Sequence, residues 1–345
     1  MPEQRKVYIR LDADHTRGMG HIFRMSILAE ILIADGVEVT FIIRSNQAAE
    51  EILQDKAFKY LSYPISMSEQ EIINSSLKQS DELPMLWIFD ILSTQPEWIE
   101  LVKQRNIKVV CFDDTEGGLV KADLVINSIA DSWGGYERNE VKAEILEGFD
   151  YSILSPEVMR YRKPRSIPKD KCLSVGITMG GSDSHGSTVV ILKAVCEMPP
   201  DKYKFNIFAG PHFLHQEELS ALLDSIDRDV LVQHSPVNFH KELDTMDIII
   251  CAGGITLYEV CTMGLPAIAF ANEPHEERTI DYFASLDACI PIGSVHHFDI
   301  NELKLKIRAL LQDRELLNKL SVSALSSVTS GTDKCVQAIY RLIAD

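Results

Sequence analysis

Short apolar runs alternate with longer segments whose apolar residues recur at helical spacing. A glycine-bearing loop follows the first run, and the helical stretch Ile22–Asp35 after it ends at Gly36. Strands that alternate with helices predict βαβ units and a mostly parallel sheet. The strands expected in the N-terminal half are Lys6–Leu11, Val37–Ile43, Leu86–Phe89, Lys108–Phe112 and Leu124–Ile126.

A second series of the same kind follows a break in the pattern. Ser155–Lys171 is rich in proline and basic residues and has neither helical nor strand period, which is typical of a linker with a hinge near residue 160. After it we expect a helix at Thr188–Cys196 and a terminal helix at Thr332–Leu342. The strands expected in this half are Cys172–Met179, Lys204–Ala209, Val230–Gln233, Ile248–Cys251 and Ala267–Phe270.

This organisation predicts an α/β protein with two Rossmann-like domains. We place an N-terminal domain at 1–160, a C-terminal domain at 161–330, and a C-terminal helix at 331–345 that can pack back on the N-terminal domain. Polar residues follow the N-terminal strands, at Asp90, Asp113-Asp114 and Asn127. In open α/β sheets the ligand site lies at the carboxyl ends of the strands. A ligand in a central cleft between two such halves is the default expectation.

Charge and composition exclude several classes of protein. The formal net charge of −17 over 345 residues disfavours general nucleic-acid binding, so phosphate would be bound locally by backbone N–H groups and a few cations. The seven cysteines include no CxxC pair, which indicates buried thiols in a reducing compartment. We find no signal-peptide pattern and no apolar run of membrane-spanning length, so a cytoplasmic protein is expected.

A glycine-rich turn after the predicted strand Ile248–Cys251 is the main candidate for binding a nucleotide diphosphate. Two glycines allow close approach of the backbone, and the start of a helix offers free N–H groups and a positive dipole end. Glu259, one turn into that helix, could accept hydrogen bonds from a ribose diol. The alternative is a purely structural turn with a solvated Glu259. A second turn after the strand at 172–179 favours phosphate binding. The expected phosphate-binding residues of the two turns are Gly253, Gly254, Ile255, Thr256, Gly180, Gly181 and Ser182.

The loop after the first strand carries the candidate catalytic residues. Its Gly18-x-Gly20 lacks the third glycine of a dinucleotide fingerprint, so a nicotinamide or flavin cofactor is not expected. His21 stands at the start of a helix, whose positive end disfavours the imidazolium form, so the ring is expected to be neutral and able to act as a general base. Asp12 and Asp14 are candidates to orient it, and Asp12 could instead bind a sugar hydroxyl. The alternative is a structural histidine.

No metal and no cofactor are expected at this loop. Asp12, Asp14, His15 and His21 could in principle ligate a metal, but their spacing matches no standard ligand pattern.

These motifs resemble the UDP-sugar hydrolase of pseudaminic acid biosynthesis and the related spore-coat polysaccharide proteins. The second half also resembles, more distantly, the UDP-GlcNAc transferase that makes lipid II. The resemblance implies a GT-B fold in which the C-terminal domain holds UDP. It further implies that His21 activates water against the anomeric carbon, which releases UDP and a free sugar. The N-terminal residues that carry the resemblance are Arg10, Asp12, Gly18, Gly20, His21 and Arg24, and the C-terminal ones are Gly180 to Asp183, Gly253, Gly254, Thr256 and Glu259.

Two positions depart from that family's pattern. Asp90 is kept, but Ile91-Leu92 follow it where the family has His-Tyr. After the strand that ends near Phe270, Glu273-Pro274-His275-Glu276 replaces an Asn-Gln pair. Both changes fall where the sugar is expected, and His275 or Glu276 could supply a polar contact to it.

The sequence therefore predicts an enzyme that hydrolyses a nucleotide-activated sugar, most simply a UDP-linked one, in polysaccharide or nonulosonic acid biosynthesis. Backbone N–H groups would stabilise the leaving diphosphate. The first alternative is a GT-B glycosyltransferase that uses a nucleotide-sugar donor. The second is a non-catalytic nucleotide-sugar-binding protein. The sequence does not specify the sugar, the base or the oligomeric state.

Overall fold

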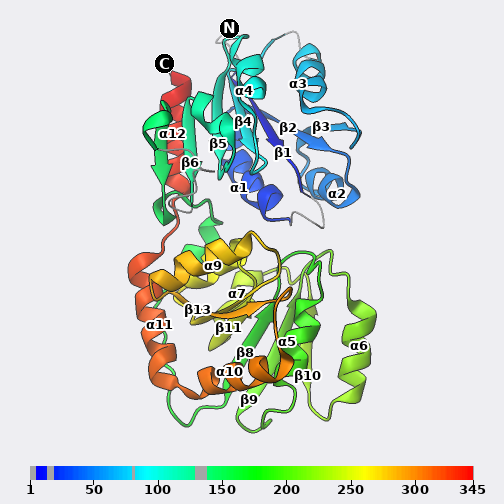
Figure 1. Ribbon diagram of the computed structural model, residues 1–345, viewed down its shortest axis with the longest axis vertical. Helices are drawn as coiled ribbons and strands as arrows, with labels where there is room; N and C mark the ends of the chain where they lie inside the picture. The colour runs from blue at the N-terminus through cyan, green and yellow to red at the C-terminus, as the bar shows by residue number, and fades with distance from the viewer. Residues whose placement is uncertain (1–4, 14–18, 80–81, 129–137, 345) are drawn as a thin grey trace. The chain divides into compact units, whose positions relative to one another are not determined.

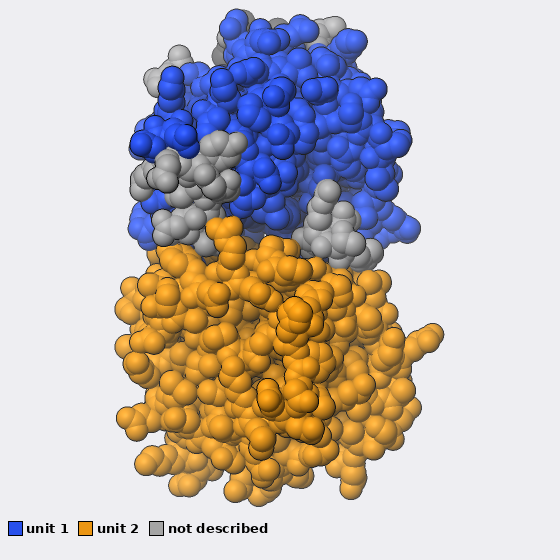
Figure 2. All heavy atoms as spheres, viewed as in Figure 1, with its two compact units in different colours: residues 1–153, 330–345 blue, residues 154–329 orange. Residues whose placement is uncertain are grey.

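The computed structural model describes residues 5–13, 19–79, 82–128 and 138–344. The chain forms two compact units, one of residues 1–153 and 330–345 and the other of residues 154–329, which Figure 2 distinguishes by colour. Each unit is an α/β sandwich around one parallel sheet, so the predicted class of two parallel-sheet α/β domains is confirmed.

The first unit is built on a seven-stranded sheet in the order β3-β2-β1-β4-β5-β6-β7, in which all neighbouring strands are parallel (Figure 1). Its strands are β1 (Lys6–Leu11), β2 (Glu38–Arg44), β3 (Lys59–Tyr63), β4 (Leu86–Asp90), β5 (Lys108–Phe112), β6 (Leu124–Asn127) and β7 (Glu144–Glu147). Its α-helices are α1 (Gly20–Ala34), α2 (Gln47–Asp55), α3 (Glu69–Lys78), α4 (Pro96–Lys103) and α12 (Thr332–Ala344). Its described residues also form the short 3₁₀ helices η1 (Gly117–Lys121), η2 (Arg138–Glu140) and η3 (Phe149–Tyr151).

The second unit repeats this plan on a six-stranded parallel sheet in the order β10-β9-β8-β11-β12-β13. Its strands are β8 (Leu173–Thr178), β9 (Tyr203–Ala209), β10 (Val230–His234), β11 (Ile248–Cys251), β12 (Ala267–Ala271) and β13 (Cys289–Ser294). Its helices are η4 (Pro156–Tyr161), α5 (Ser187–Val195), α6 (Gln216–Ser225), α7 (Phe239–Asp244), α8 (Ile255–Thr262), α9 (Glu276–Ser285), α10 (Ile300–Gln312) and α11 (Arg314–Ser327).

The strand order reverses direction once in each sheet. The chain runs outward from β1 to β3 and then returns to β4 on the other side of β1, and β8 and β11 stand in the same relation in the second unit. The crevice at the carboxyl ends of such a strand pair is where open α/β sheets bind ligands. The loops after β1, β4, β8 and β11 are therefore the places where a site is expected.

The central strands are buried on both faces, which explains their continuous apolar sequences. In the first unit, Ile9 and Phe41 pack with α1, α2 and α12 on one face, while Trp87 and Val109 pack with α3 and α4 on the other. The second unit has a large core around Val175, Ile250 and Phe270. These cores fix the strand ends, and with them the functional loops.

The segment Ser155–Lys171 differs from the expected linker. It contains η4 and buries Val158 and Ile167. The whole segment belongs to the second unit, which begins at Leu154, whereas the sequence pattern predicts a domain boundary at residue 160. Arg162 donates to the carbonyl oxygens of Thr262 (2.7 Å) and Val328 (2.8 Å), at the carboxyl ends of α8 and α11. Helix ends leave carbonyl groups without partners, and a basic side chain satisfies them. Arg162 therefore has a structural role, and Lys163 and Arg165 form ion pairs with Asp244.

The C-terminal helix α12 packs on the first unit beside α1 (Figure 1). Cys335 and Ile339 are buried in the same core as β1, and Lys334 forms an ion pair of 2.6 Å with Asp150. All seven cysteines are free thiols, and five of them are buried. Among the described residues, no helix combines the length and apolar character needed to cross a membrane.

Candidate active site

A histidine–aspartate pair lies at the switch point of the first unit. His21 stands in the first turn of α1, and its Nδ1 is 2.8 Å from Oδ1 of Asp90, the last residue of β4. The register between β1 and β4 pairs Leu11 with Asp90, and His21 at the start of α1 lies next to this carboxylate. A carboxylate only accepts hydrogen bonds, so Nδ1 of His21 is the donor, and in the neutral form of the ring Nε2 has the free lone pair. This geometry is that of an oriented general base.

Arg24, one turn further along α1, keeps Asp90 ionised. Its Nε donates to Asp90 Oδ2 at 2.8 Å, and its two terminal nitrogens donate to Asp90 Oδ1 and to Asp113. Burial acts to raise the pKa of Asp90, but the charge of Arg24 and the hydrogen bonds from Arg24 and His21 outweigh it and lower the pKa to about 2. Asp90 is therefore a carboxylate over the whole range in which an enzyme would work.

Asp113 anchors the other side of Arg24. It follows β5 in a left-handed conformation with φ of 45° and accepts hydrogen bonds from the backbone N–H (2.7 Å) and hydroxyl (3.0 Å) of Ser128. The neighbouring Asp114 is buried and accepts hydrogen bonds from the backbone N–H and the hydroxyl of Thr94. Burial raises the pKa of Asp114 to about 6, although its hydrogen bonds from Thr94 and from the N–H of Glu116 lower it. The loops after β4, β5 and β6 thus converge on α1.

Arg10 and Asp12 form a separate, buried network. Arg10 is fully buried and donates to Glu69 (2.6 and 2.9 Å) and Asp12 (2.6 and 3.1 Å). Arg44 also donates to Glu69, at 3.0 Å. The ion pairs described for Asp12 go to Arg10 and Arg44, whereas the carboxylate against His21 is that of Asp90. Arg10 therefore positions the end of β1 and has no atom exposed to a ligand.

The structure does not describe three of the residues that the sequence singled out in this loop. Asp14, His15 and Gly18 lie outside the residues that the structure describes, and Gly20 begins α1. The sequence does not mark Glu69 as part of a buried network, because a glutamate in the first turn of a helix is ordinarily solvated and stabilised by the helix dipole. Only the fold shows that it partners a buried arginine 59 residues away.

The glycine turns of the second unit lie at its own switch point. A Cβ atom on Gly253 would lie 2.7 Å from Cβ of Glu276, so this position requires glycine. Gly254 is the N-cap of α8, where it offers no side chain to the free N–H groups of Ile255 and Thr256. No side chain therefore caps the first turn of α8, and its N–H groups can bind an anion.

Glu276 occupies part of this turn with its own carboxyl group. It is buried and accepts hydrogen bonds from the backbone N–H groups of Asn272 (2.8 Å), Glu273 (3.2 Å) and Gly253. Burial raises the pKa of Glu276 to about 7, although these three hydrogen bonds lower it. Glu276 thus fixes the Gly253 turn against the loop after β12, while His275, the N-cap residue of α9, is exposed.

The turn after β8 packs closely against the loop after β9. Gly180 has φ of +83°, and a Cβ atom on Gly210 would lie 2.4 Å from the carbonyl oxygen of Gly181. Ser182 is buried, and Asp183 accepts hydrogen bonds from the N–H groups of Ser187 and Thr188, both at 2.8 Å. Asp183 therefore occupies the first N–H groups of α5, whereas no side chain caps α8, so the N-terminus of α8 offers more room for a diphosphate.

Glu259 contacts a histidine in the described structure. Its Oε1 lies 3.0 Å from Nε2 of His240, and Nδ1 of that ring lies 3.5 Å from Glu157. Burial lowers the pKa of His240, but Glu259 and Glu157 together raise it above its ordinary value. His240 thus orients Glu259 on the side of α8 that faces α7.

Comparison with known proteins supports the fold and shows similarity to a polysaccharide biosynthesis protein. No family model matches the chain. The chain is 29% identical over 290 residues to the spore coat polysaccharide biosynthesis protein SpsG of Bacillus subtilis, covering 83% of each protein. The structure is similar to MurG of Acinetobacter baumannii, with a TM-score of 0.66, 17% identity, and coverage of 97% of this chain and 99% of that one. It is also similar to HepE of Anabaena in complex with UDP and glucose (TM-score 0.59, 12% identity, 98% and 99% coverage). The two parallel-sheet domains have glycosyltransferases of the GT-B fold as structural neighbours, which confirms the predicted fold.

Proposed function

We propose that the protein cleaves the bond between a sugar and a nucleoside diphosphate, with His21 as the general base. The observation that carries this proposal is the pairing of His21 Nδ1 with Asp90 at 2.8 Å, at the switch point of a parallel sheet. A base of this kind removes a proton from an attacking hydroxyl or water. Similarity to a polysaccharide biosynthesis protein supports sugar chemistry.

The second unit is proposed to hold the diphosphate of the nucleotide. Gly254 has no side chain to obstruct a phosphate at the start of α8, and the N–H groups there can donate to the phosphate oxygens. The net charge of −17 gives the protein no general attraction for polyanions, so binding would rest on these local donors. The neighbour HepE, crystallised with UDP and glucose, supports a uridine nucleotide as the first one to test.

The proposed reaction is a single displacement at the anomeric carbon. His21 Nε2 takes the proton of the nucleophile as its oxygen forms the new bond to that carbon. The bond between the anomeric carbon and the diphosphate oxygen breaks, and the nucleoside diphosphate leaves with the electron pair. Backbone N–H groups at the start of α8 stabilise the charge that develops on the leaving group.

Two reactions share this chemistry and differ only in the nucleophile. With water, the protein is a nucleotide-sugar hydrolase, as the sequence motifs around His21 suggest. With an acceptor hydroxyl it is a glycosyltransferase, and the structural neighbours that are transferases favour this second candidate. The His21–Asp90 pair would serve either nucleophile, so the acceptor requirement decides between them.

A screen of nucleotide sugars tests the proposal. Purified protein is incubated with UDP-, CDP- and GDP-sugars, and released nucleoside diphosphate is measured with and without candidate acceptors. Release without acceptor, with an equal amount of free sugar, is expected for the hydrolase. Release that depends on an acceptor identifies the transferase. Binding of a nucleotide sugar with no release under either condition would contradict an enzymatic role and support a binding protein.

The Gly254→Ala variant tests the phosphate site. Its Cβ would meet only Glu276 Oε1, at 3.2 Å, so the fold should lose no more than about 1 kcal/mol from the poorer helix cap. The same methyl group takes the space next to the N–H groups of α8, so we expect affinity for the nucleoside diphosphate to fall roughly tenfold or more. Calorimetric titration with UDP measures this. Unchanged affinity in a folded Gly254→Ala variant would place the diphosphate elsewhere.

A further inference from the structure

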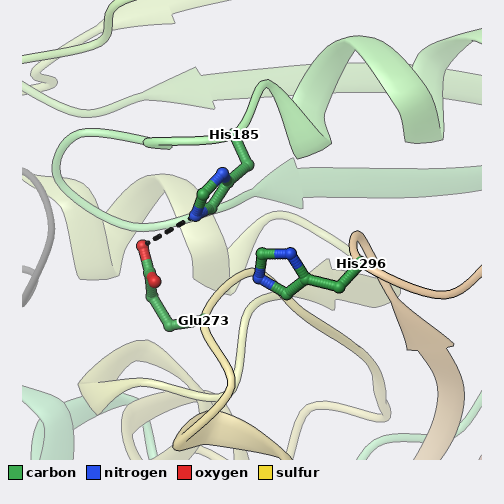
Figure 3. Close-up of side chains that lie close together, drawn as sticks. All are labelled: His185, Glu273 and His296. Atoms are coloured by element: carbon green, nitrogen blue, oxygen red, sulfur yellow. Dashed lines mark ion pairs between the residues drawn. The ribbon is translucent and has the colours of Figure 1, made fainter.

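Two histidines and a glutamate gather at the carboxyl edge of the second unit's sheet, and none of the three is assigned a role in the proposed reaction. The cluster consists of His185, Glu273 and His296, whose ligand atoms all lie within 4.8 Å of one another (Figure 3). His185 Nε2 is 3.4 Å from Glu273 Oε1, and the two imidazole rings meet edge to face with centroids 4.8 Å apart. Both histidines are exposed and the glutamate is buried.

The topology of the sheet brings these residues together from distant parts of the sequence. Ala271 of β12 pairs with Ser294 of β13, and Glu273 and His296 each stand two residues beyond that pair. His185 lies in the loop between β8 and α5. All three residues therefore extend from the carboxyl edge of one parallel sheet, where loops rather than helices present them.

The carboxylate is already held in place by neighbouring side chains. Ser184 Oγ donates to Glu273 Oε1 at 2.5 Å. Asn272 contacts the same serine through its Nδ2 at 3.4 Å and accepts a hydrogen bond of 2.6 Å from Ser187 on the other side of its amide. Outer contacts of this kind orient metal ligands and tune their affinity. The buried position of Glu273 thus has a structural cause that is independent of the two histidines.

We propose that His185, Glu273 and His296 bind one divalent transition-metal ion, for which Zn²⁺ is the reference case. Two imidazoles and one carboxylate suit zinc and its neighbours in the first transition row, whereas calcium and magnesium prefer sites made of oxygen ligands alone. Bonds of about 2.0–2.1 Å in a tetrahedral site place ligand atoms roughly 3.3 Å apart. The 3.4 Å separation of His185 and Glu273 already matches, whereas the exposed His296, with its ligand atom within 4.8 Å of the others, must move closer to complete the site.

The bound ion would keep at least one coordination position for water or another small ligand. Three protein ligands leave the fourth tetrahedral position open, and the two exposed histidines put that position on the solvent side. The alternative for the same residues is an ion pair between His185 and Glu273, with the ring of His296 in edge-to-face contact with His185. An ion pair predicts no stoichiometric uptake of metal, which makes the two alternatives separable by titration.

The test is a titration of chelator-treated full-length protein with ZnCl₂, followed by calorimetry, with no nucleotide present. One equivalent is expected to bind to the wild type. His185→Ala and His296→Ala should each weaken this binding on the order of 100-fold, because removal of a ligand exceeds the 10–100-fold effect of losing an outer contact. His297→Ala is the matched control, since His297 is an exposed histidine in the same turn, and its affinity should stay within about twofold of the wild type.

Titration with Co²⁺ gives a second, spectroscopic measurement. Visible d–d absorption that grows to one equivalent in the wild type and in His297→Ala, and is lost in His185→Ala, is the expected result. Glu273→Gln should also lose it, with thermal unfolding without metal as the check that the variant is folded. Stoichiometric binding that survives both histidine substitutions would assign the ion to other groups, such as the thiols, and overturn the proposal. So would the absence of any one-equivalent binding. Neither outcome affects the role proposed for His21, because no turnover is measured.

Discussion

The His21→Ala variant is expected to release nucleoside diphosphate from its sugar nucleotide on the order of 10²–10⁴-fold more slowly than the wild type, because it has no base for the nucleophile. His21 lies in the first turn of α1 in the first unit, whereas the proposed diphosphate donors belong to the second. Nucleotide affinity should therefore change little, and the loss of activity should appear as a lower kcat. Steady-state kinetics combined with calorimetric titration of UDP separates the two quantities.

A glutamine at the same position distinguishes chemistry from structure. His21→Gln can still donate an amide hydrogen to Asp90, so the charge network around Arg24 is kept while no basic nitrogen remains. We expect His21→Gln to be as slow as His21→Ala but to have thermal stability closer to that of the wild type. Turnover near the wild-type rate in His21→Ala would remove His21 from the mechanism. Recovery of turnover in His21→Gln alone would reduce its role to positioning.

The Asp90→Asn variant is expected to lose both activity and stability. Arg24 donates to both oxygens of Asp90, so an asparagine loses one of these bonds in either orientation of its amide. Without the carboxylate, Nδ1 is no longer fixed as the protonated nitrogen, and Nε2 can present a hydrogen to the nucleophile. In a comparable Asp–His pair the wrong tautomer costs on the order of 10⁴-fold in kcat. Loss of one partner of a buried ion pair costs about 3–5 kcal/mol, with the lower value expected here because Asp113 still pairs with Arg24.

Asp113→Asn is the matched control for this variant. Both carboxylates pair with Arg24, but His21 is bonded to Asp90. The left-handed backbone at position 113, with φ of 45°, also suits asparagine. We expect Asp113→Asn to be destabilised, by no more than Asp90→Asn, while kcat stays within about tenfold of the wild type. Denaturant unfolding and kcat measured on both variants give the comparison. Equal loss of kcat in the two would mean that Arg24, and not the histidine tautomer, controls the rate.

The pH dependence of unfolding adds a check on Asp90. Its pKa in the folded protein is about 2, below the ordinary value of 3.8, so the unfolded chain binds the proton more readily. The stabilisation by Asp90 is therefore fully present above about pH 4 and is lost as the pH falls through 2. The difference in unfolding free energy between wild type and Asp90→Asn should accordingly be constant near neutral pH and shrink only in strong acid.

The sequence determined the interior strands of both sheets. Lys6–Leu11, Lys108–Phe112 and Ile248–Cys251 have the bounds that their apolar runs predict, because strands buried on both faces need continuous apolar residues. The strands that the pattern missed are β3, β7 and β13, and all three lie at sheet edges. Edge strands are partly exposed, so Lys59–Tyr63 and Glu144–Glu147 mix polar and apolar residues and give no clear signal.

The sequence also identified the residue types of the site, since His21, Asp90 and the glycine turns all follow predicted strands. It could not decide which carboxylate meets the histidine. Asp12 is nearer to His21 along the chain, but the register of β1 against β4 places Asp90 there, and Asp12 pairs with the buried Arg10 and the partly buried Arg44. The cluster of His185, Glu273 and His296 gave no signal at all, because its members are separated by many residues and meet only at the edge of a folded sheet. Local sequence patterns thus determined most of the helices and strands and the candidate chemistry. Strand order and register decided which side chains meet, because the pairing of distant strands leaves no trace in the local sequence.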